Sequence, residues 1–121
     1  MIIVHGTFPV KPKVREDALE VMRHMAIASR AEPGCITYEF YIGLSDMNTL
    51  LLFQEWESVE ALQDHFQTDH WEEFVRLLPD FLNGEVLNRR YEVRETREEM
   101  EESPEVEGKF SNFGPSEIII H

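Results

Sequence analysis

Apolar residues in the first part of the chain change their spacing from one segment to the next. Residues 1–10 are apolar and β-branched with polar residues between them, which predicts a strand. Between residues 15 and 31 the apolar residues recur three and four positions apart, as on one face of a helix, and Pro33-Gly34 ends that segment. Residues 35–42 alternate and residues 49–56 are mostly apolar, so both segments are expected to be strands joined by a hairpin.

The second half of this region repeats the change from helix to strand. Ser58 can cap a helix that begins directly after it. Asp69 followed by Glu72 resembles a capping box, so a further helical segment is expected from about residue 70. Pro79 is expected to end or kink that segment. Residues 85–94 alternate again and are predicted to form the last strand.

The predicted order of elements is βαββαβ, the split arrangement of a ferredoxin-like α+β fold. It implies a four-stranded antiparallel sheet with both helices on one face. The other face would expose large apolar side chains, and a bare face of that kind usually marks an interface. We therefore expect residues 1–94 to form one domain that pairs as a two-fold homodimer.

The charge of the chain is strongly negative and unevenly distributed. The net charge is −13, and residues 95–121 contain eight acidic and two basic residues. Nucleic-acid partners are disfavoured because phosphate backbones are repelled. A bound anion would need a local positive charge in this acidic chain. The arginines that could supply it are Arg30, Arg76, Arg89 and Arg90. We expect residues 95–121 to be an acidic tail, with the hypothesis that it straps the dimer partner through its terminal isoleucines.

The location of the protein is predicted from what the sequence lacks. Cys35 is the single cysteine, which excludes an internal disulfide framework. The start of the chain has a strand-like run without a basic flank, so no signal peptide is expected. No apolar run approaches the roughly 18 residues of a membrane span. The expected location is cytoplasmic, without a membrane partner.

Two motifs of this chain resemble a known family. They are the helix end Glu32-Pro33-Gly34-Cys35 with Tyr38 in the strand behind it, and the run from Glu55-Trp56 through Ala61-Leu62 to His65, Thr68 and His70. Both resemble the antibiotic biosynthesis monooxygenase family, over roughly residues 1–93. The resemblance implies a ferredoxin-like dimer whose two sheets form a shared barrel. The family includes cofactor-independent quinol and polyketide oxygenases, and related branches degrade haem or isomerise a sugar-derived molecule.

The candidate catalytic residues are His65, His70 and Trp56. A histidine can act as a general base because its pKa lies near neutrality, although either histidine can equally serve as a hydrogen-bonding residue at the helix junction. Trp56 can be a core aromatic or a pocket wall, and the resemblance favours the wall. The two histidines lack the HEXXH spacing and an evident third ligand, so no metal site is predicted.

The remaining candidates would shape a substrate pocket. The predicted substrate-binding residues are His5, Tyr38, Phe53, Phe66 and Phe74. No glycine-rich phosphate loop or dinucleotide fingerprint occurs, so no cofactor is expected. The interpretation is a cofactor-independent monooxygenase that oxidises a small quinol or polycyclic aromatic molecule with dioxygen. The alternatives are an isomerase, a non-catalytic member that binds a small ligand, or a binding module whose tail recruits a partner.

Overall fold

The structure is a computed structural model that describes residues 1–94 and 96. Its elements follow the predicted order: β1 (Ile2–Pro9), the 3-10 turn η1 (Pro12–Val14), α1 (Arg15–Arg30), β2 (Cys35–Ile42), β3 (Thr49–Trp56), α2 (Val59–His65), α3 (Asp69–Phe81) and β4 (Leu87–Glu92). Apart from Thr96, the predicted acidic tail and its strap lie outside the described residues.

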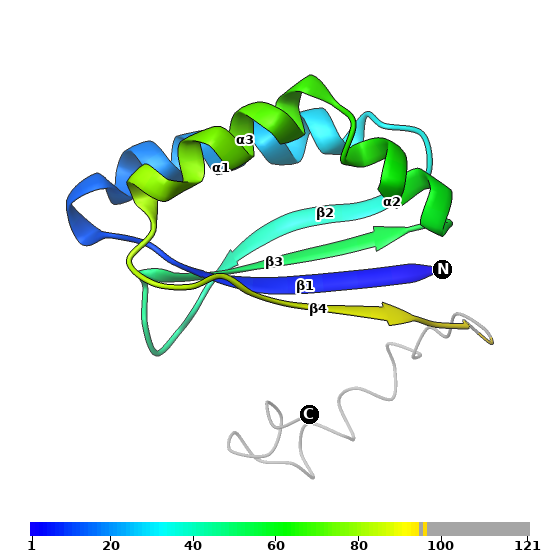
Figure 1. Ribbon diagram of the computed structural model, residues 1–121. Helices are drawn as coiled ribbons and strands as arrows, with labels where there is room; N and C mark the ends of the chain where they lie inside the picture. The colour runs from blue at the N-terminus through cyan, green and yellow to red at the C-terminus, as the bar shows by residue number, and fades with distance from the viewer. Residues whose placement is uncertain (95, 97–121) are drawn as a thin grey trace, which may run out of the picture.

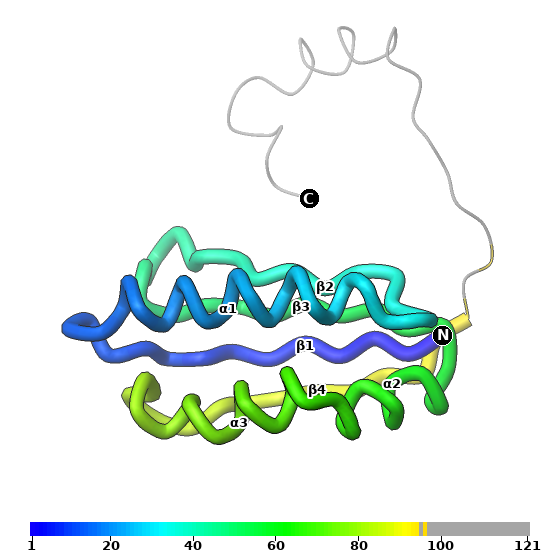
Figure 2. Tube along the Cα trace, turned by 90° about the horizontal axis from the view of Figure 1, so that it is seen from above, coloured from blue at the N-terminus to red at the C-terminus, as the bar shows by residue number. Residues whose placement is uncertain are grey.

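The four strands form one antiparallel sheet in the order β2-β3-β1-β4. All helices lie on one face of this sheet (Figure 1). Seen from above, α1 runs along β2 and β3, whereas α2 and α3 run on the side of β4 (Figure 2). The predicted ferredoxin-like α+β fold is confirmed.

The core lies between the helices and the sheet, and β3 shows how the sequence places it there. Side chains alternate between the two faces of a strand, and in β3 every second residue is buried under the helices: Leu50, Leu52, Gln54 and Trp56. Full burial of one large apolar side chain stabilises the fold by about 1.5–3 kcal/mol. The residues between them face the open side of the sheet and are only partly buried.

The helix ends match the predictions in part. Ser58 caps α2, because its Oγ accepts a hydrogen bond from the Ala61 backbone N–H at 3.1 Å. The cap of α3 is Thr68 and not Asp69, since the Thr68 hydroxyl accepts from the Trp71 N–H at 3.2 Å. Pro79 does not end α3, which continues to Phe81. Among the described residues, no helix combines the length and the apolar character needed to cross a membrane.

Candidate functional site

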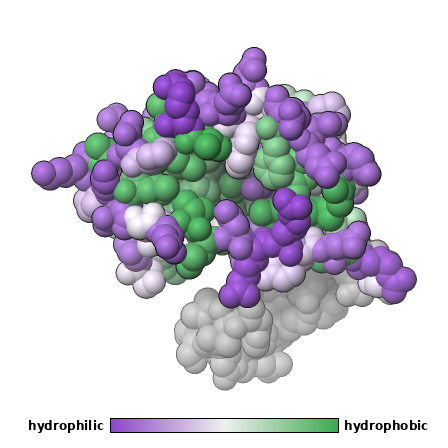
Figure 3. Space-filling model, viewed as in Figure 1, coloured by the Kyte–Doolittle hydropathy of each residue, from purple (hydrophilic) through white to green (hydrophobic). Residues whose placement is uncertain are grey.

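A hollow of about 350 Å³ lies between α3 and the sheet, at the side where β4 forms the edge. Figure 3 shows apolar side chains gathered on this side of the molecule, between the helices and the sheet. The hollow is lined by Val4, Phe8, Leu52, Gln54, Phe66, Trp71, Phe74, Leu78, Val86, Asn88, Arg89 and Arg90. An apolar hollow with a few polar groups is the usual form of a small-molecule site.

Behind one wall of this hollow, a carboxylate joins two histidines. One oxygen of Glu32, Oε2, lies 2.7 Å from Nδ1 of His65 and 2.5 Å from Nε2 of His70. His65 is fully buried, Glu32 nearly so, and 28% of the His70 side chain is exposed. An ionised carboxylate only accepts hydrogen bonds, so Nδ1 of His65 carries a proton and donates the hydrogen bond to Glu32. Nε2 of His65 then bears a lone pair.

The turn after α1 places Glu32 beside α2. Gly34 has a φ of +83°, which favours glycine, and a Cβ there would lie 2.6 Å from Cβ of Ala61. The turn therefore packs directly on α2, and the Glu57 N–H donates to the Gly34 carbonyl at 2.8 Å. At the other side, the Thr68 hydroxyl donates to the His65 carbonyl at 2.7 Å. These two hydrogen bonds thus fix the backbone close to Glu32 and at His65.

Aromatic rings surround His65. The ring centroids of Trp56, Tyr38 and Trp71 lie 4.8, 5.3 and 5.4 Å from that of the histidine. Three buried polar atoms of this region have no hydrogen-bond partner among the described residues: Ser29 Oγ, Tyr38 Oη and His65 Nε2. Such atoms are rare in the interior of proteins, and they mark a place where a water molecule or a ligand group can bind.

The surroundings change the pKa of His65 and that of Tyr38. Burial lowers the pKa of His65 below its usual 6.5; the hydrogen bond and charge of Glu32 oppose this effect, and His70 adds to it. His65 is therefore neutral at pH 7, as a base must be. Burial raises the pKa of Tyr38, so its phenol stays protonated and can donate a hydrogen bond.

The lowered pKa of His65 predicts a dependence of stability on pH. The unfolded chain binds a proton on this residue below about pH 6.5, whereas the folded chain resists it. The free energy of unfolding should therefore be highest above pH 6.5 and fall as the pH falls toward the folded pKa. The measurement is urea denaturation between pH 8 and 5. His65→Phe should flatten this part of the profile, and an unchanged slope would contradict the assignment.

Glu32, His65 and His70 are also the residues that could together bind a metal ion. Their candidate ligand atoms all lie within 4.8 Å of one another, so Glu32 is the third ligand that the sequence analysis did not find. Two features favour hydrogen bonds over a metal site. The contacts to Glu32 have hydrogen-bond lengths, and Nε2 of His65 lacks the acceptor that a ligating histidine usually has for its second nitrogen.

The structure places most of the predicted site residues in two adjoining layers. Phe66 and Phe74 line the hollow. Trp56, Tyr38 and His65 are fully buried in the layer behind it, and His70 is linked to His65 through Glu32. Phe66 and Trp71, the latter without a predicted role, contact both layers, because they line the hollow and their ring centroids lie 5.8 and 5.4 Å from that of His65. One aromatic layer therefore separates the candidate base from the hollow.

His5 and Phe53 do not belong to this group. They pair with each other across β1 and β3, on the open face of the sheet. There His5 stacks on Tyr91, with ring centroids 5.4 Å apart. Both are predicted substrate-binding residues, but the hollow beside α3 does not include them. Phe53 lies three positions from Trp56, and a strand turns such residues to opposite faces.

Two polar residues of the site had no assigned role in the sequence prediction. Glu32 stands in a motif that the prediction used only as a helix end. Gln54 interrupts the apolar positions of β3, and its Oε1 accepts from the Trp56 indole N–H at 2.8 Å. Arg90, one of the four arginines named as candidates for binding an anion, lies over the Phe66 ring, 5.9 Å from its centroid.

Comparisons with known proteins agree with the fold. Residues 1–77 match the family described as Antibiotic biosynthesis monooxygenase. The uncharacterized protein sll1783 of Synechocystis is 38% identical over 79% of this chain, which spans 65% of that relative's length. "Putative monooxygenase YcnE" of Bacillus subtilis is 28% identical over 78% of this chain and its own whole length. A conserved protein from Methanosarcina mazei has a solved structure with a TM-score of 0.73, at 27% identity, covering 77% of this chain and 92% of that one.

Proposed function

Since the chain belongs to the antibiotic biosynthesis monooxygenase family, we propose that it is a cofactor-independent monooxygenase for a small, electron-rich hydroxyaromatic molecule such as a quinol or an anthrone. One observation carries the proposal: Glu32 holds Nδ1 of His65, which leaves Nε2 as a buried lone pair without a partner in the described part of the chain. A buried base of this kind beside an apolar hollow fits the removal of a proton from a phenol.

The base would begin the reaction. Nε2 of His65 takes the acidic proton of the substrate, and the Glu32 carboxylate stabilises the imidazolium that forms. The resulting anion is electron-rich enough to pass an electron to dioxygen. The apolar walls exclude water and hold the ring, so the protein's contribution is orientation and electrostatics.

The redox balance needs no other reductant. An anthrone-type carbon loses two hydrogens and gains one oxygen atom, and the second oxygen atom leaves as water. A quinol likewise becomes a hydroxyquinone plus water when it consumes one dioxygen. In both cases the substrate supplies all four electrons, so the proposal requires no flavin or metal.

Access to the base requires a movement of side chains. His65 is fully buried and Trp71 and Phe66 stand between it and the hollow. A shift of the Trp71 ring would open this layer and let a substrate hydroxyl reach Nε2. His70 is partly exposed and lies on α3, the helix that also carries Trp71. It is linked to His65 of α2 through Glu32, so it would hold the Glu32–His65 pair in place.

A second copy of the chain would cover the open face of the sheet. The large side chains Tyr41, Leu87 and Tyr91 are exposed to 49, 65 and 41%, and their strand positions place them on this face with His5 and Phe53. Burying such residues is favourable, and a two-fold dimer is the simplest way to do so. Under this proposal His5 and Phe53 belong to the interface and not to the substrate wall.

The direct test is oxygen consumption by the purified chain with a panel of menadiol, dihydroxynaphthalenes and anthrone. The proposal expects saturable uptake, with a product that gains one oxygen atom from ¹⁸O₂. Chelation with EDTA should leave the rate unchanged. A rate that EDTA removes and a divalent metal restores would assign Glu32, His65 and His70 to a metal instead, and a panel without enzyme-dependent uptake would count against the oxygenase.

The second candidate is an isomerase that uses the same base. The depth of His65 favours it, because this reaction needs only the substrate, and not dioxygen as well, to reach the buried Nε2. An isomerase moves a proton within its substrate and needs no oxygen. Proton exchange at an acidic carbon of a bound ketone under anaerobic conditions, followed by NMR in D₂O, would support this candidate when the aerobic panel shows no uptake.

A further inference from the structure

The hollow next to β4 has polar groups that can all donate hydrogen bonds. Besides its apolar walls, it is lined by Gln54, Asn88, Arg89 and Arg90, and none of the acidic residues among 1–94 lines it. This is unusual for a chain with a net charge of −13. We propose that the hollow selects substrates that carry a negative charge, a carboxylate or an ionised phenol on a flat ring system, and that Arg90 binds this charge. The proposal rests on the proposed function and names its substrate class.

The three donor residues that carry the proposal lie close together on the helix face of the sheet. Gln54 and Arg90 flank Val4 in one row across β3, β1 and β4. Asn88 lies one row further along β4 on the same face, opposite Gly6. Their side chains can therefore contact one bound molecule from the floor of the hollow.

Among the described residues, two of these groups, Gln54 and Arg90, are free to donate to a ligand. An indole N–H can only donate, so Trp56 requires the oxygen of Gln54 and leaves the amide NH₂ for a ligand. Arg90 lies over Phe66 and forms no ion pair with an acid in residues 1–94. A guanidinium matches the geometry of a carboxylate with two parallel hydrogen bonds.

Gly6 provides the space for Asn88. A Cβ at this position would lie 2.0 Å from Oδ1 of Asn88 and 3.1 Å from the Leu87 carbonyl oxygen. The Asn88 side chain thus folds across β1 into the hollow, and only glycine permits this. Gly6 has an ordinary strand conformation, so its role is the close approach and not a special backbone angle.

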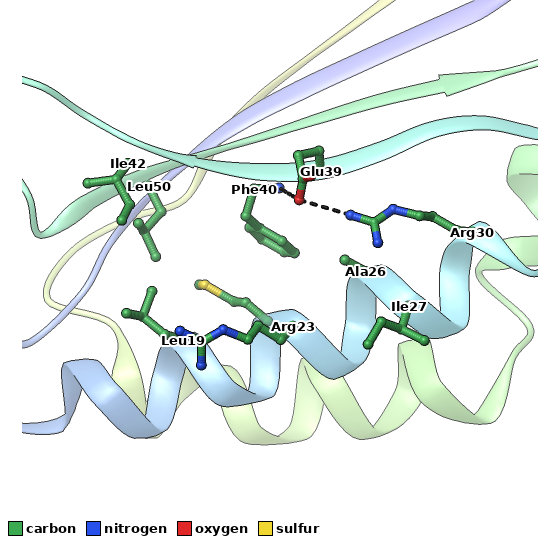
Figure 4. A pocket seen from close by; sticks show the side chains of 10 residues that line it. Leu19, Arg23, Ala26, Ile27, Arg30, Glu39, Phe40, Ile42 and Leu50 are labelled. Atoms are coloured by element: carbon green, nitrogen blue, oxygen red, sulfur yellow. Dashed lines mark hydrogen bonds and ion pairs between the residues drawn. The ribbon is translucent and has the colours of Figure 1, made fainter.

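The second hollow on this face of the sheet offers a contrast. It lies between α1 and β2, has about 320 Å³, and is also lined by arginines (Figure 4). There, however, Arg30 pairs with Glu39 at 2.9 Å, and Arg23 pairs with Glu20 at 3.1 Å. Their charges are neutralised within the chain, so, of the two hollows and within residues 1–94, the one beside β4 presents a cation without an acidic partner.

The test uses probes that cannot react with oxygen, so that its result does not depend on the proposed chemistry. Isothermal titration of the full chain compares 2-naphthoate with the neutral 2-naphthamide. The naphthoate should bind roughly 10- to 100-fold more tightly, as expected for a hydrogen bond to a charged group. Arg90→Gln should remove this preference, and Arg76→Gln, which alters an exposed arginine paired with Glu73, should retain it.

A second variant separates the pocket from the general charge of the surface. Gly6→Ala should displace the Asn88 side chain and weaken the binding of both probes, with circular dichroism to verify the fold. Equal affinities for the two probes in the unchanged protein would overturn the proposal. So would a preference that persists in Arg90→Gln. A clear preference without any oxygen uptake would instead support the anion site while the oxygenase fails.

Discussion

The His65→Gln variant should turn over its substrate about 10²- to 10⁴-fold more slowly in kcat/KM, the range usual for the loss of a general base. Glutamine keeps a donor for Glu32 and a similar size, but it has no group that accepts a proton at neutral pH. The measurement is the initial rate of oxygen uptake with the best substrate of the quinol panel. The binding of 2-naphthoate should change little, because His65 does not line the hollow.

The matched control for this experiment is His24→Gln. His24 is an exposed histidine of α1 beside Glu20, with 77% of its side chain accessible. Its variant should keep full activity. If His65→Gln retains more than about a third of the original rate while its melting temperature is unchanged, His65 is not the base and the oxygenase mechanism derived above is wrong.

Glu32→Gln is expected to have the second-largest effect, a decrease of about 10²-fold or more in kcat/KM. An amide can present its NH₂ to Nδ1 of His65, which moves the histidine proton to Nε2 and removes the lone pair from the hollow side. It also removes the charge that raises the pKa of His65. The activity that remains should therefore show an acid limb at lower pH than in the unchanged protein.

The pH profile distinguishes this positioning role from a general loss of structure. An unstable variant would lose activity at every pH without moving the limb. Glu39→Gln is the control, because Glu39 also pairs with a cationic residue, Arg30, but lies in the other hollow. An acid limb of Glu32→Gln that coincides with that of the unchanged protein would contradict the coupling between Glu32 and His65.

The fold could be predicted from local patterns because each element has its own period. The strands at residues 35–42 and 49–56 have the predicted bounds, since alternation and a continuous apolar run both end at turn-forming residues. Ser58 was identified as a cap from its type and position. The cap of α3 was misassigned to Asp69, because Thr68 and Asp69 are both good capping residues and only the backbone geometry selects between them.

The site was less predictable, because its parts come from distant positions. Glu32 is 33 residues from His65 and 38 from His70, so no local pattern joins them. Phe53 is a different case. The period of a strand places Phe53 and Trp56 on opposite faces, so their separation is already contained in the sequence.

The sequence alone determined the order of the elements and the family, because these follow from the spacing of apolar residues and from short motifs. The tertiary structure decided which polar groups meet: the carboxylate shared by two histidines, and the arginine that lies over Phe66. The reason is physical. Burial follows from the local hydrophobic pattern, whereas a contact between two side chains depends on the packing of every element between them.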